Sequence, residues 1–239
     1  MGIAIVTGAS RGLGRALAAG LASRGWSLVI DARGGEALRA AEAELQPLMR
    51  PGARLVAIPG DVTDAKHRQA LAGAAHALGG LDLLVSNAGI LGPSPLPKLD
   101  AYPLAGLRDL MEVYVVAALG LIQESIAMLR AAPSGGRIVI VTSDASVEAY
   151  EGWGGYGAAK AAADQLARVL AVEEPALRVW AVDPGDLRTH MHQLAYPGED
   201  ITDRPEPDAV VPAIIGLVES SRPSGRVRAA DLAASPIAP

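Results

Sequence analysis

The chain has 239 residues, of which 50% are hydrophobic, 20% are charged and 3% are aromatic, and it contains no cysteine. This composition lies in the globular range and excludes a disordered chain, a collagen-like chain and a disulfide scaffold. The net charge of −5 leaves no basic surplus for a phosphate backbone, so nucleic acid is not an expected partner. The length indicates a single domain over residues 1–239.

Short aliphatic runs alternate with longer runs rich in Ala and Leu, and they predict strands and helices in turn. The predicted strands are 3–6, 28–30, 55–58, 83–85, 137–142 and 178–182. The predicted helices are 13–23, 36–49, 65–78, 104–129 and 156–172. Because the strand runs lack polar alternation, helices should cover both faces of the sheet. The expected fold class is therefore α/β, a doubly wound parallel sheet (Rossmann fold) in three layers, α/β/α.

No membrane or metal site is expected. The start of the sequence lacks the pattern of a signal peptide, and the longest apolar stretch, 113–122, is about half of what a membrane crossing needs. The histidines lack metal spacing with carboxylates, and His190 and His192 are interpreted as loop residues. The absence of cysteine is compatible with a reducing compartment, and we expect a cytoplasmic protein.

A glycine-rich segment follows the first strand. Its spacing is Gly-x-x-x-Gly-x-Gly over Gly8, Gly12 and Gly14, and a helical run follows directly. Glycines at such a turn let backbone amides face a diphosphate, and the N-terminus of the helix adds partial positive charge. A Walker-type phosphate loop is excluded because no Gly-Lys-Ser/Thr follows. The segment therefore predicts a dinucleotide site.

The sequence resembles the short-chain dehydrogenase/reductase family in its single-domain form, from residue 3 to about residue 231. The motifs that carry the resemblance are Thr7-Gly8-x-x-x-Gly12-x-Gly14, Asp61-Val62, Asn87-Ala88-Gly89, Ser143, Tyr156-Gly157-Ala158-Ala159-Lys160, and Pro184-Gly185 with Thr189. The resemblance implies that Asp61 and Val62 contact adenine, that Asn87 and Gly89 line the cofactor cleft, and that Thr189 contacts the nicotinamide carboxamide. The expected cofactor-binding residues are Thr7, Gly8, Ser10, Arg11, Gly12, Leu13, Gly14, Arg33, Asp61, Val62, Asn87, Ala88, Gly89, Tyr156, Lys160, Pro184, Gly185 and Thr189.

The charge at the end of the second strand selects the nucleotide. In the family's register, Ala32 stands where an acid would bind the free ribose of NAD, and Arg33 follows it. Arg11 adds a second cation. A guanidinium can hold a phosphate through two hydrogen bonds, so NADP(H) is favoured over NAD(H). A register slip of one residue would instead make Asp31 the ribose ligand.

The expected catalytic residues are Ser143, Tyr156 and Lys160. Tyr156 opens a predicted helix, and Lys160 lies one turn later on the same face. A tyrosine that exchanges protons near neutrality needs its pKa lowered by about three units, and a cation about 4 Å away supplies energy of that order. Ser143 ends a strand thirteen positions before Tyr156, the usual family interval. A Tyr-x-x-x-Lys pair is, on its own, also common on helix surfaces.

The implied mechanism is hydride transfer between NADP(H) and a small or medium carbonyl compound or secondary alcohol. Ser143 would orient the carbonyl oxygen, Tyr156 would act as general acid and base, and Lys160 would also bind the nicotinamide ribose. Tyr114 departs from the family, which usually carries an asparagine there that holds a water of the proton relay. This departure predicts reduced or specialised activity. It also supports the alternative of a non-catalytic NAD(P)-binding redox-sensing or regulatory protein.

The substrate region and the assembly follow from the fold. Residues 186–208 form a polar, proline-containing segment that we interpret as a substrate lid, with a disordered surface loop as the alternative. The substrate-facing candidates are Leu91, Gly92, Asp144, Ala145, Tyr150, Trp153, His190, Met191 and Tyr196. Wide apolar faces on helices 104–129 and 156–172 predict a homodimer or homotetramer.

Overall fold

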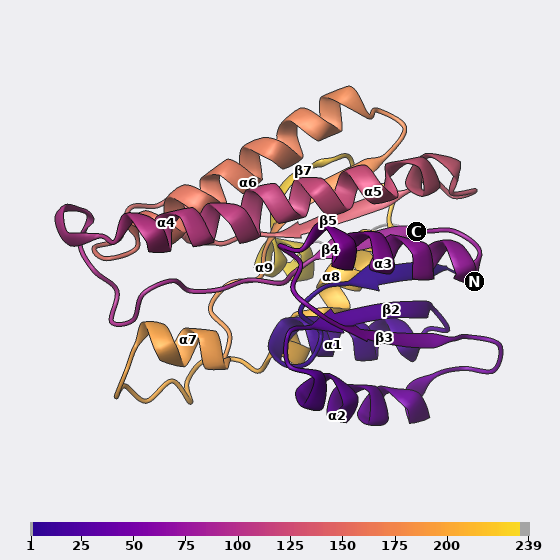
Figure 1. The fold of residues 1–239 in the computed structure, drawn as a ribbon, viewed down its shortest axis with the longest axis horizontal. Helices are drawn as coiled ribbons and strands as arrows, with labels where there is room; N and C mark the ends of the chain where they lie inside the picture. The colour runs from indigo at the N-terminus through magenta and orange to yellow at the C-terminus, as the bar shows by residue number, and fades with distance from the viewer. Residues whose placement is uncertain (1, 235–239) are drawn as a thin grey trace.

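Seven parallel strands form one sheet in the order β3-β2-β1-β4-β5-β6-β7 (Figure 1). The structure is a computed structural model that describes residues 2–234. The strands are β1 Ile3–Val6, β2 Ser27–Ala32, β3 Leu55–Pro59, β4 Leu83–Ser86, β5 Arg137–Val141, β6 Arg178–Asp183 and β7 Gly225–Arg228. The strand order reverses between β1 and β4, and in such sheets ligands bind in the crevice outside the carboxyl ends of the strands at that point.

Helices cover both faces of the sheet, which confirms the predicted fold class (Figure 1). One layer contains α1 Gly12–Ala22, α2 Gly35–Leu45, α8 Val211–Glu219 and α9 Ala229–Ala234. The other contains α3 Ala65–Leu78, α4 Leu104–Met111, α5 Ala118–Ala131 and α6 Gly154–Glu173. The remaining helix, α7 His190–Ala195, lies at the same end of the molecule as α4 (Figure 1).

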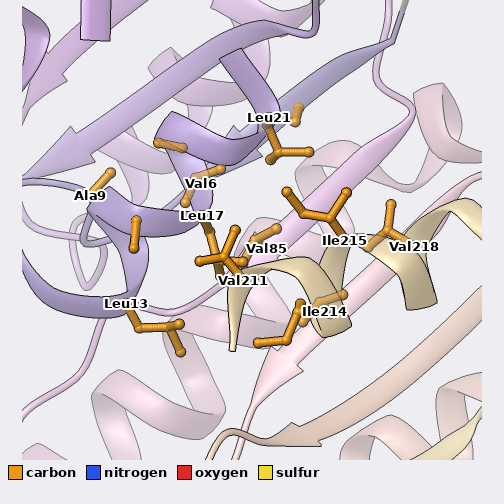
Figure 2. Close-up of a cluster of buried hydrophobic side chains, with 14 of the residues drawn as sticks. Val6, Ala9, Leu13, Leu17, Leu21, Val85, Val211, Ile214, Ile215 and Val218 are labelled. Carbon is orange, nitrogen blue, oxygen red and sulfur yellow. The ribbon is translucent and has the colours of Figure 1, made fainter. Parts of the chain in front are cut away.

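Alternate residues of each strand enter two separate cores. Val6 of β1 packs in the core beneath α1 and α8, while its neighbour Ile5 packs in the core beneath α3, α5 and α6. Helices α1 and α8 approach closely because Gly20 faces Ile215; a Cβ on Gly20 would lie 2.6 Å from the Cδ1 atom of Ile215. Figure 2 shows the aliphatic side chains of α1 and α8 interdigitating over this first core. Close helix packing thus replaces the aromatic bulk that the composition lacks.

Several predicted boundaries were wrong. The helix predicted at 36–49 ends at Leu45 and continues as a 3-10 turn, Gln46–Leu48, that contains Pro47. The helix predicted at 104–129 is divided into α4 and α5 by a π-helical segment, Glu112–Ala117. The segment 186–208 is not structureless, because it contains α7. Strand β7 and helix α8 were not predicted.

The helical run from α4 to α5 is long and apolar enough to cross a membrane, with a mean hydropathy of 1.5 in its most apolar window. In this structure the buried apolar residues of its α5 part pack against the sheet. Leu121, Ile122 and Leu129 all belong to the core beneath α3, α5 and α6. The run is therefore a core helix of the α/β/α arrangement.

Candidate active site

The loops after β1 and β4 are bonded to each other at the reversal of strand order. The Oγ1 atom of Thr7 accepts hydrogen bonds of 2.9 Å from the backbone amides of both Asn87 and Ala88. The side-chain amide of Asn87 donates in return to the carbonyl oxygen of Thr7 at 2.8 Å. Thr7 and Asn87, both predicted from the sequence, thus hold the loops after β1 and β4 together.

The glycine loop packs closely against its neighbours in the fold. Gly8 and Gly12 have φ values of 67° and 55°, a region that residues with a side chain rarely adopt. A Cβ on Gly14 would lie 2.4 Å from the side-chain nitrogen of Asn87, and one on Gly12 would lie 3.5 Å from the Cγ2 atom of Thr189. The segment that carries Thr189 therefore lies against the glycine loop, although the two are far apart in the sequence.

The N-terminus of α1 is available to an anion. Arg11 occupies the N-cap position, and its side chain makes no capping hydrogen bond within the described residues. The first amides of a helix point outward and attract negative charge when no side chain caps them. The glycine loop and this helix end therefore fit the diphosphate of a dinucleotide.

Asp31 does not face a ribose. It is buried, and its Oδ1 atom accepts a hydrogen bond of 2.7 Å from the backbone amide of Gly8. Its Oδ2 atom lies 2.9 Å from the Nε2 atom of His67, which is also buried. The alternative in which Asp31 binds the ribose of NAD is therefore not supported, because both carboxylate oxygens are committed to the protein. His67 was not singled out in the sequence, although a buried strand aspartate needs such a partner.

Arg33 and Asp61 lie just beyond the carboxyl ends of β2 and β3, respectively. Arg33 is exposed directly after β2, and Ala32 beside it is buried. Burial raises the pKa of Asp61, but hydrogen bonds from Thr63 and the charges of Arg33 and His67 outweigh it and hold the pKa below its usual value. The arrangement leaves Arg33 as a cation beside an ionised carboxylate.

The three predicted catalytic residues lie around the carboxyl end of β5. Ser143 follows β5, while Tyr156 and Lys160 occupy the first two turns of α6. The Nζ atom of Lys160 donates to the carbonyl oxygen of Val141 at 2.8 Å and lies 5.4 Å from the ring centroid of Tyr156. Both side chains are almost fully buried, with 8% exposure for Tyr156 and 3% for Lys160. The Tyr-x-x-x-Lys pair is thus not a surface pair.

The pKa values differ from the expectation. Burial raises the pKa of Tyr156 well above its ordinary value, and the charges of Asp144 and Asp183 act in the same direction. Burial lowers the pKa of Lys160 to about 7, against the opposing effect of Asp164 and Asp183. The expected lowering of the Tyr156 pKa by Lys160 is therefore absent in this structure, because desolvation of the phenol dominates.

The hydroxyl of Ser143 is held by its neighbours. It donates to Oδ1 of Asp144 at 2.9 Å and accepts from the backbone amide of Ala145 at 3.2 Å. Oδ2 of Asp144 accepts a hydrogen bond of 3.0 Å from the hydroxyl of Tyr150. Ser143 must therefore turn away from Asp144 before it can donate to a substrate oxygen.

Tyr114 fills the space behind Lys160. It is buried, its ring meets that of Tyr156 edge to face at 5.6 Å, and its hydroxyl donates to the carbonyl oxygen of Ile90 at 2.6 Å. Burial also raises the pKa of Tyr114 well above its ordinary value. A Cβ on Gly89 would lie 2.5 Å from the Tyr114 hydroxyl oxygen, so the glycine makes room for the larger side chain.

A row of aromatic side chains connects α7 with Tyr156. The ring of His192 lies 4.9 Å from that of Tyr196, which lies 6.2 Å from the ring of Trp153. Trp153 in turn lies 5.5 Å from Tyr156. The hydroxyl of Ser94 donates to the carbonyl oxygen of Leu194 at 2.7 Å, so the loop after β4 also contacts α7. Several substrate-facing candidates therefore lie together beside Tyr156.

Comparison with known proteins identifies the family. A family profile described as short chain dehydrogenase matches residues 2–200. The chain belongs to the short-chain dehydrogenase family. It is accordingly an NAD(P)-dependent oxidoreductase, which confirms the predicted enzyme class.

Relatives of this short-chain dehydrogenase include reductases. It is 36% identical to sepiapterin reductase of Rattus norvegicus over 202 residues, which cover 81% of the chain and 77% of the relative. It is 33% identical over 198 residues to a benzil reductase ((S)-benzoin forming) of Saccharomyces cerevisiae, covering 80% and 73%.

Similar solved structures contain the predicted type of nucleotide. A short chain dehydrogenase from Shigella flexneri complexed with NADP has a TM-score of 0.87 at 29% identity, and the match covers 95% of each chain. An alcohol dehydrogenase from Thermococcus sibiricus complexed with 5-hydroxy-NADP has a TM-score of 0.84 at 26% identity, again covering 95% of each chain. Binding of a nicotinamide dinucleotide thus agrees with the crevice described above.

Proposed function

We propose that this short-chain dehydrogenase reduces a small or medium carbonyl compound with NADPH, with Tyr156 as the proton donor. The observation that carries the proposal is the burial of Tyr156 and Lys160 side by side at the carboxyl end of β5. Carbonyl reduction requires a protonated acid beside the carbonyl oxygen. The raised pKa of Tyr156 keeps its proton in place until that oxygen gains negative charge.

Each site residue has one task in this reaction. The cofactor supplies a hydride when it is bound. The Ser143 hydroxyl turns from Asp144 to the substrate oxygen, where it stabilises the developing charge. Tyr156 gives its proton to the same oxygen. Lys160, with a pKa of about 7, changes its protonation near neutrality and so returns a proton to the site. Oxidation of a secondary alcohol follows the same path in reverse.

The preference for NADP(H) over NAD(H) is part of the proposal. It is supported by Arg33, which is exposed after β2, and by Asp31, which is withdrawn from the site to bind Gly8. It is also supported by the NADP compounds named in the two similar structures. Arg33 would hold the 2′-phosphate through charged hydrogen bonds.

The proposed substrate has a flat apolar body. Trp153 and Tyr196 present aromatic surface beside Tyr156, and segment 186–208 is proposed to close over the substrate. The similar proteins named sepiapterin reductase and benzil reductase support a carbonyl compound as the substrate.

The test is a panel of aldehydes and ketones with NADPH, followed by the absorbance of the reduced nicotinamide. We expect turnover by the wild type and a loss of about 100-fold or more in kcat for Tyr156→Phe. The matched control is Tyr102→Phe, because Tyr102 is also buried and its hydroxyl has no partner among residues 2–234. NADPH binding measured by fluorescence should persist in both variants. Binding without turnover in the wild type would instead favour the non-catalytic regulator.

We also propose that residues 1–239 act as one domain and assemble into a homodimer or homotetramer in the cytoplasm. Val116, Val169 and Val172 are exposed by 49%, 42% and 81% on the layer that contains α5 and α6, and self-association would bury them. The lack of cysteine supports a reducing compartment. Light scattering at micromolar concentration tests the assembly, and a monomer would contradict it.

A further inference from the structure

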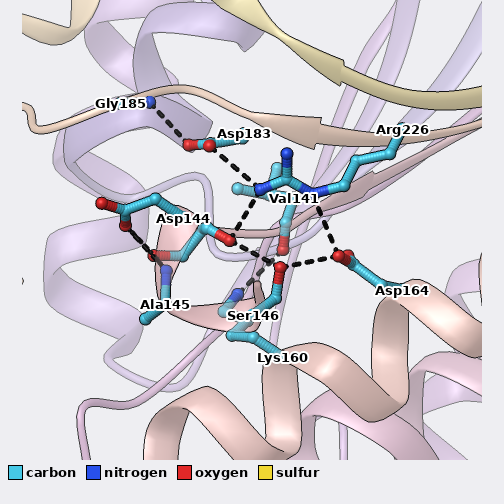
Figure 3. A network of polar contacts seen from close by, with 10 residues as sticks. Val141, Asp144, Ala145, Ser146, Lys160, Asp164, Asp183, Gly185 and Arg226 are labelled. Carbon is cyan, nitrogen blue, oxygen red and sulfur yellow. Dashed lines mark hydrogen bonds and ion pairs between the residues drawn. The ribbon is translucent and has the colours of Figure 1, made fainter. Parts of the chain in front are cut away.

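Arg226 of β7 reaches the catalytic segment from the far edge of the sheet (Figure 3). Its Nη2 atom donates to the carbonyl oxygen of Ser143 at 3.0 Å and to Oδ2 of Asp183 at 3.1 Å. Its Nε atom donates to Oδ2 of Asp164 at 3.1 Å. One guanidinium therefore binds three acceptors on three different elements. A planar fork of donors suits this role, and the single point charge of a lysine does not.

The acceptors of Arg226 are themselves parts of the candidate site. Asp164 lies on α6 one turn after Lys160, and Ser146 donates to it at 2.7 Å. Asp183 ends β6, and its Oδ1 atom accepts a hydrogen bond of 3.0 Å from the amide of Gly185 in the turn expected to face the cofactor. Figure 3 shows these bonds meeting around the guanidinium. The cluster thus connects the turn that begins at Ser143, helix α6 with Lys160, and the turn that contains Gly185.

The charges of the cluster are buried and balanced. The side chains of Asp164 and Asp183 are exposed by only 4% and 3%, and that of Arg226 by 17%. The second carboxylate oxygen of Asp164 is buried and accepts no hydrogen bond within the described part of the chain. Two buried carboxylates without cations would be strongly unfavourable. Arg226 supplies one compensating positive charge, and Lys160 supplies a second when it is protonated.

We propose that Arg226 is a positioning residue for the reduction, because it fixes the backbone of Ser143 and holds the Asp164 and Asp183 carboxylates beside Lys160. This inference rests on the proposed function, since it assumes the roles given above to Ser143, Tyr156 and Lys160. Among the described residues, the hydrogen bonds of Arg226 go to Ser143, Asp164 and Asp183, and none goes to Tyr156. It acts through these three residues.

Removal of the guanidinium has an electrostatic consequence besides the loss of geometry. Lys160 is faced by Tyr156 and Asp164 of α6, Tyr114 of the π-helical segment and Asp183 of β6. Asp144 acts on Tyr156, and Arg226 of β7 is paired with both Asp164 and Asp183. Without Arg226 this set becomes more negative by one charge. Negative charge favours the protonated forms, so the pKa values of both Lys160 and Tyr156 rise.

The test compares Arg226→Met with Arg228→Met, which changes an exposed arginine two residues further along the same strand. We expect kcat to fall about tenfold or more in Arg226→Met and to stay near the wild-type value in Arg228→Met. For alcohol oxidation by Arg226→Met, the pH at which kcat/KM falls on the acidic side should be about one unit higher than in the wild type. This shift corresponds to a tenfold change in the protonation equilibrium. The rise in thermal stability with pH that the low Lys160 pKa causes should also begin about one unit higher.

Two further variants separate charge from geometry. Arg226→Lys should return the pH limb of kcat/KM toward the wild type but should not restore kcat. Lysine keeps the charge, but its compact ammonium lacks the planar fork with which the guanidinium spans acceptors on three elements. The double variant Arg226→Met, Asp183→Asn should also return the acidic limb of the kcat/KM profile to its wild-type pH, since removing one carboxylate restores the charge balance. The inference would be overturned if the pH profile of kcat/KM in Arg226→Met equalled that of the wild type and its kcat fell only in proportion to the fraction of folded protein. Absence of turnover in the wild type would overturn the proposed function, while the pH dependence of stability would still test the cluster.

Discussion

The Nζ atom of Lys160 lies 3.8 Å from the centroid of the Tyr114 ring. A cation over an aromatic face is stabilised by about 2 kcal/mol when the pair is desolvated, as it is here. The same ring excludes water from the side of Lys160 where the family usually carries an asparagine. Burial then lowers the pKa of Lys160 to about 7. The Tyr114 ring therefore stabilises the charged form of Lys160 by direct contact and disfavours the same form by excluding water from it.

Replacement of Tyr114 by asparagine should restore solvation. We expect Tyr114→Asn to raise kcat for carbonyl reduction severalfold at pH 8, because water admitted to the vacated space raises the pKa of Lys160 and connects it with solvent. The free energy of unfolding should fall by about 3 kcal/mol, since a buried aromatic ring is lost. Steady-state kinetics and thermal unfolding measure the two effects.

Tyr114→Phe is the matched control. It keeps the ring under Lys160 and removes the hydroxyl, which donates to the carbonyl oxygen of Ile90 and also interacts with the phenol of Tyr156, where it lowers the pKa. Its rate should stay near that of the wild type, with a loss of stability of about 1 kcal/mol. Equal rates in Tyr114→Asn and the wild type would mean that position 114 serves packing alone.

The buried pair of Asp31 and His67 should hold the glycine loop. Asp31→Ala leaves the Gly8 amide and the Nε2 atom of His67 without their partner, so we expect a loss of about 2 kcal/mol or more and a higher KM for NADPH. Asp31→Asn keeps an oxygen for Gly8 and should be milder. Thermal unfolding and cofactor titration measure both. If KM for NADPH were unchanged in both Asp31→Ala and Asp31→Asn, Asp31 would not hold the glycine loop for the cofactor.

Arg33 should discriminate between the two nucleotides. Arg33→Met is expected to raise KM for NADPH by about tenfold or more and to leave KM for NADH nearly unchanged, because charged hydrogen bonds to a phosphate contribute about 1.5–3 kcal/mol. The control is Arg24→Met at the far end of α1, where the arginine is also exposed. A similar increase for both nucleotides would show that Arg33 does not bind the 2′-phosphate.

The sequence predicted what depends on local pattern. The sheet and its helices follow from aliphatic periodicity, and the glycine loop follows from spacing, so β1 and α3 were predicted with their observed bounds. Strand β7, by contrast, reads Gly-Arg-Val-Arg, with no apolar run to reveal it. Arg226 of this strand is largely buried only because the carboxylates of Asp164 and Asp183, which are distant in the sequence, neutralise its charge.

The candidate site was predictable in its members and less so in its electrostatics. Ser143, Tyr156 and Lys160 were identified by type and spacing, and the structure brings them to one strand end. The direction of the Tyr156 pKa shift was not predictable, because it depends on how completely the fold excludes water from the ring. The same holds for His67, whose partner Asp31 is known only once α3 is packed against β2.

Lys160 should make stability depend on pH. Its pKa is about 7 in the folded protein and near its ordinary value of 10.5 in the unfolded chain. Between these values the unfolded chain binds more protons, so stability rises with pH through this window and the benefit is lost as pH falls to 7. Each pH unit contributes up to about 1.4 kcal/mol, or about 3–6 °C in Tm for a chain of this size.

Lys160→Met removes this dependence, so Tm of the variant should exceed that of the wild type most at pH 7 and by progressively less at pH 8 and 9. The control is Lys66→Met, which changes an exposed lysine near the start of α3 and should leave the pH profile of Tm unchanged. Thermal unfolding at each pH, without cofactor, measures the effect. A constant difference between Lys160→Met and the wild type from pH 7 to 9 would mean that Lys160 stays protonated in the folded protein, and that its desolvation is compensated by Asp164 and Asp183.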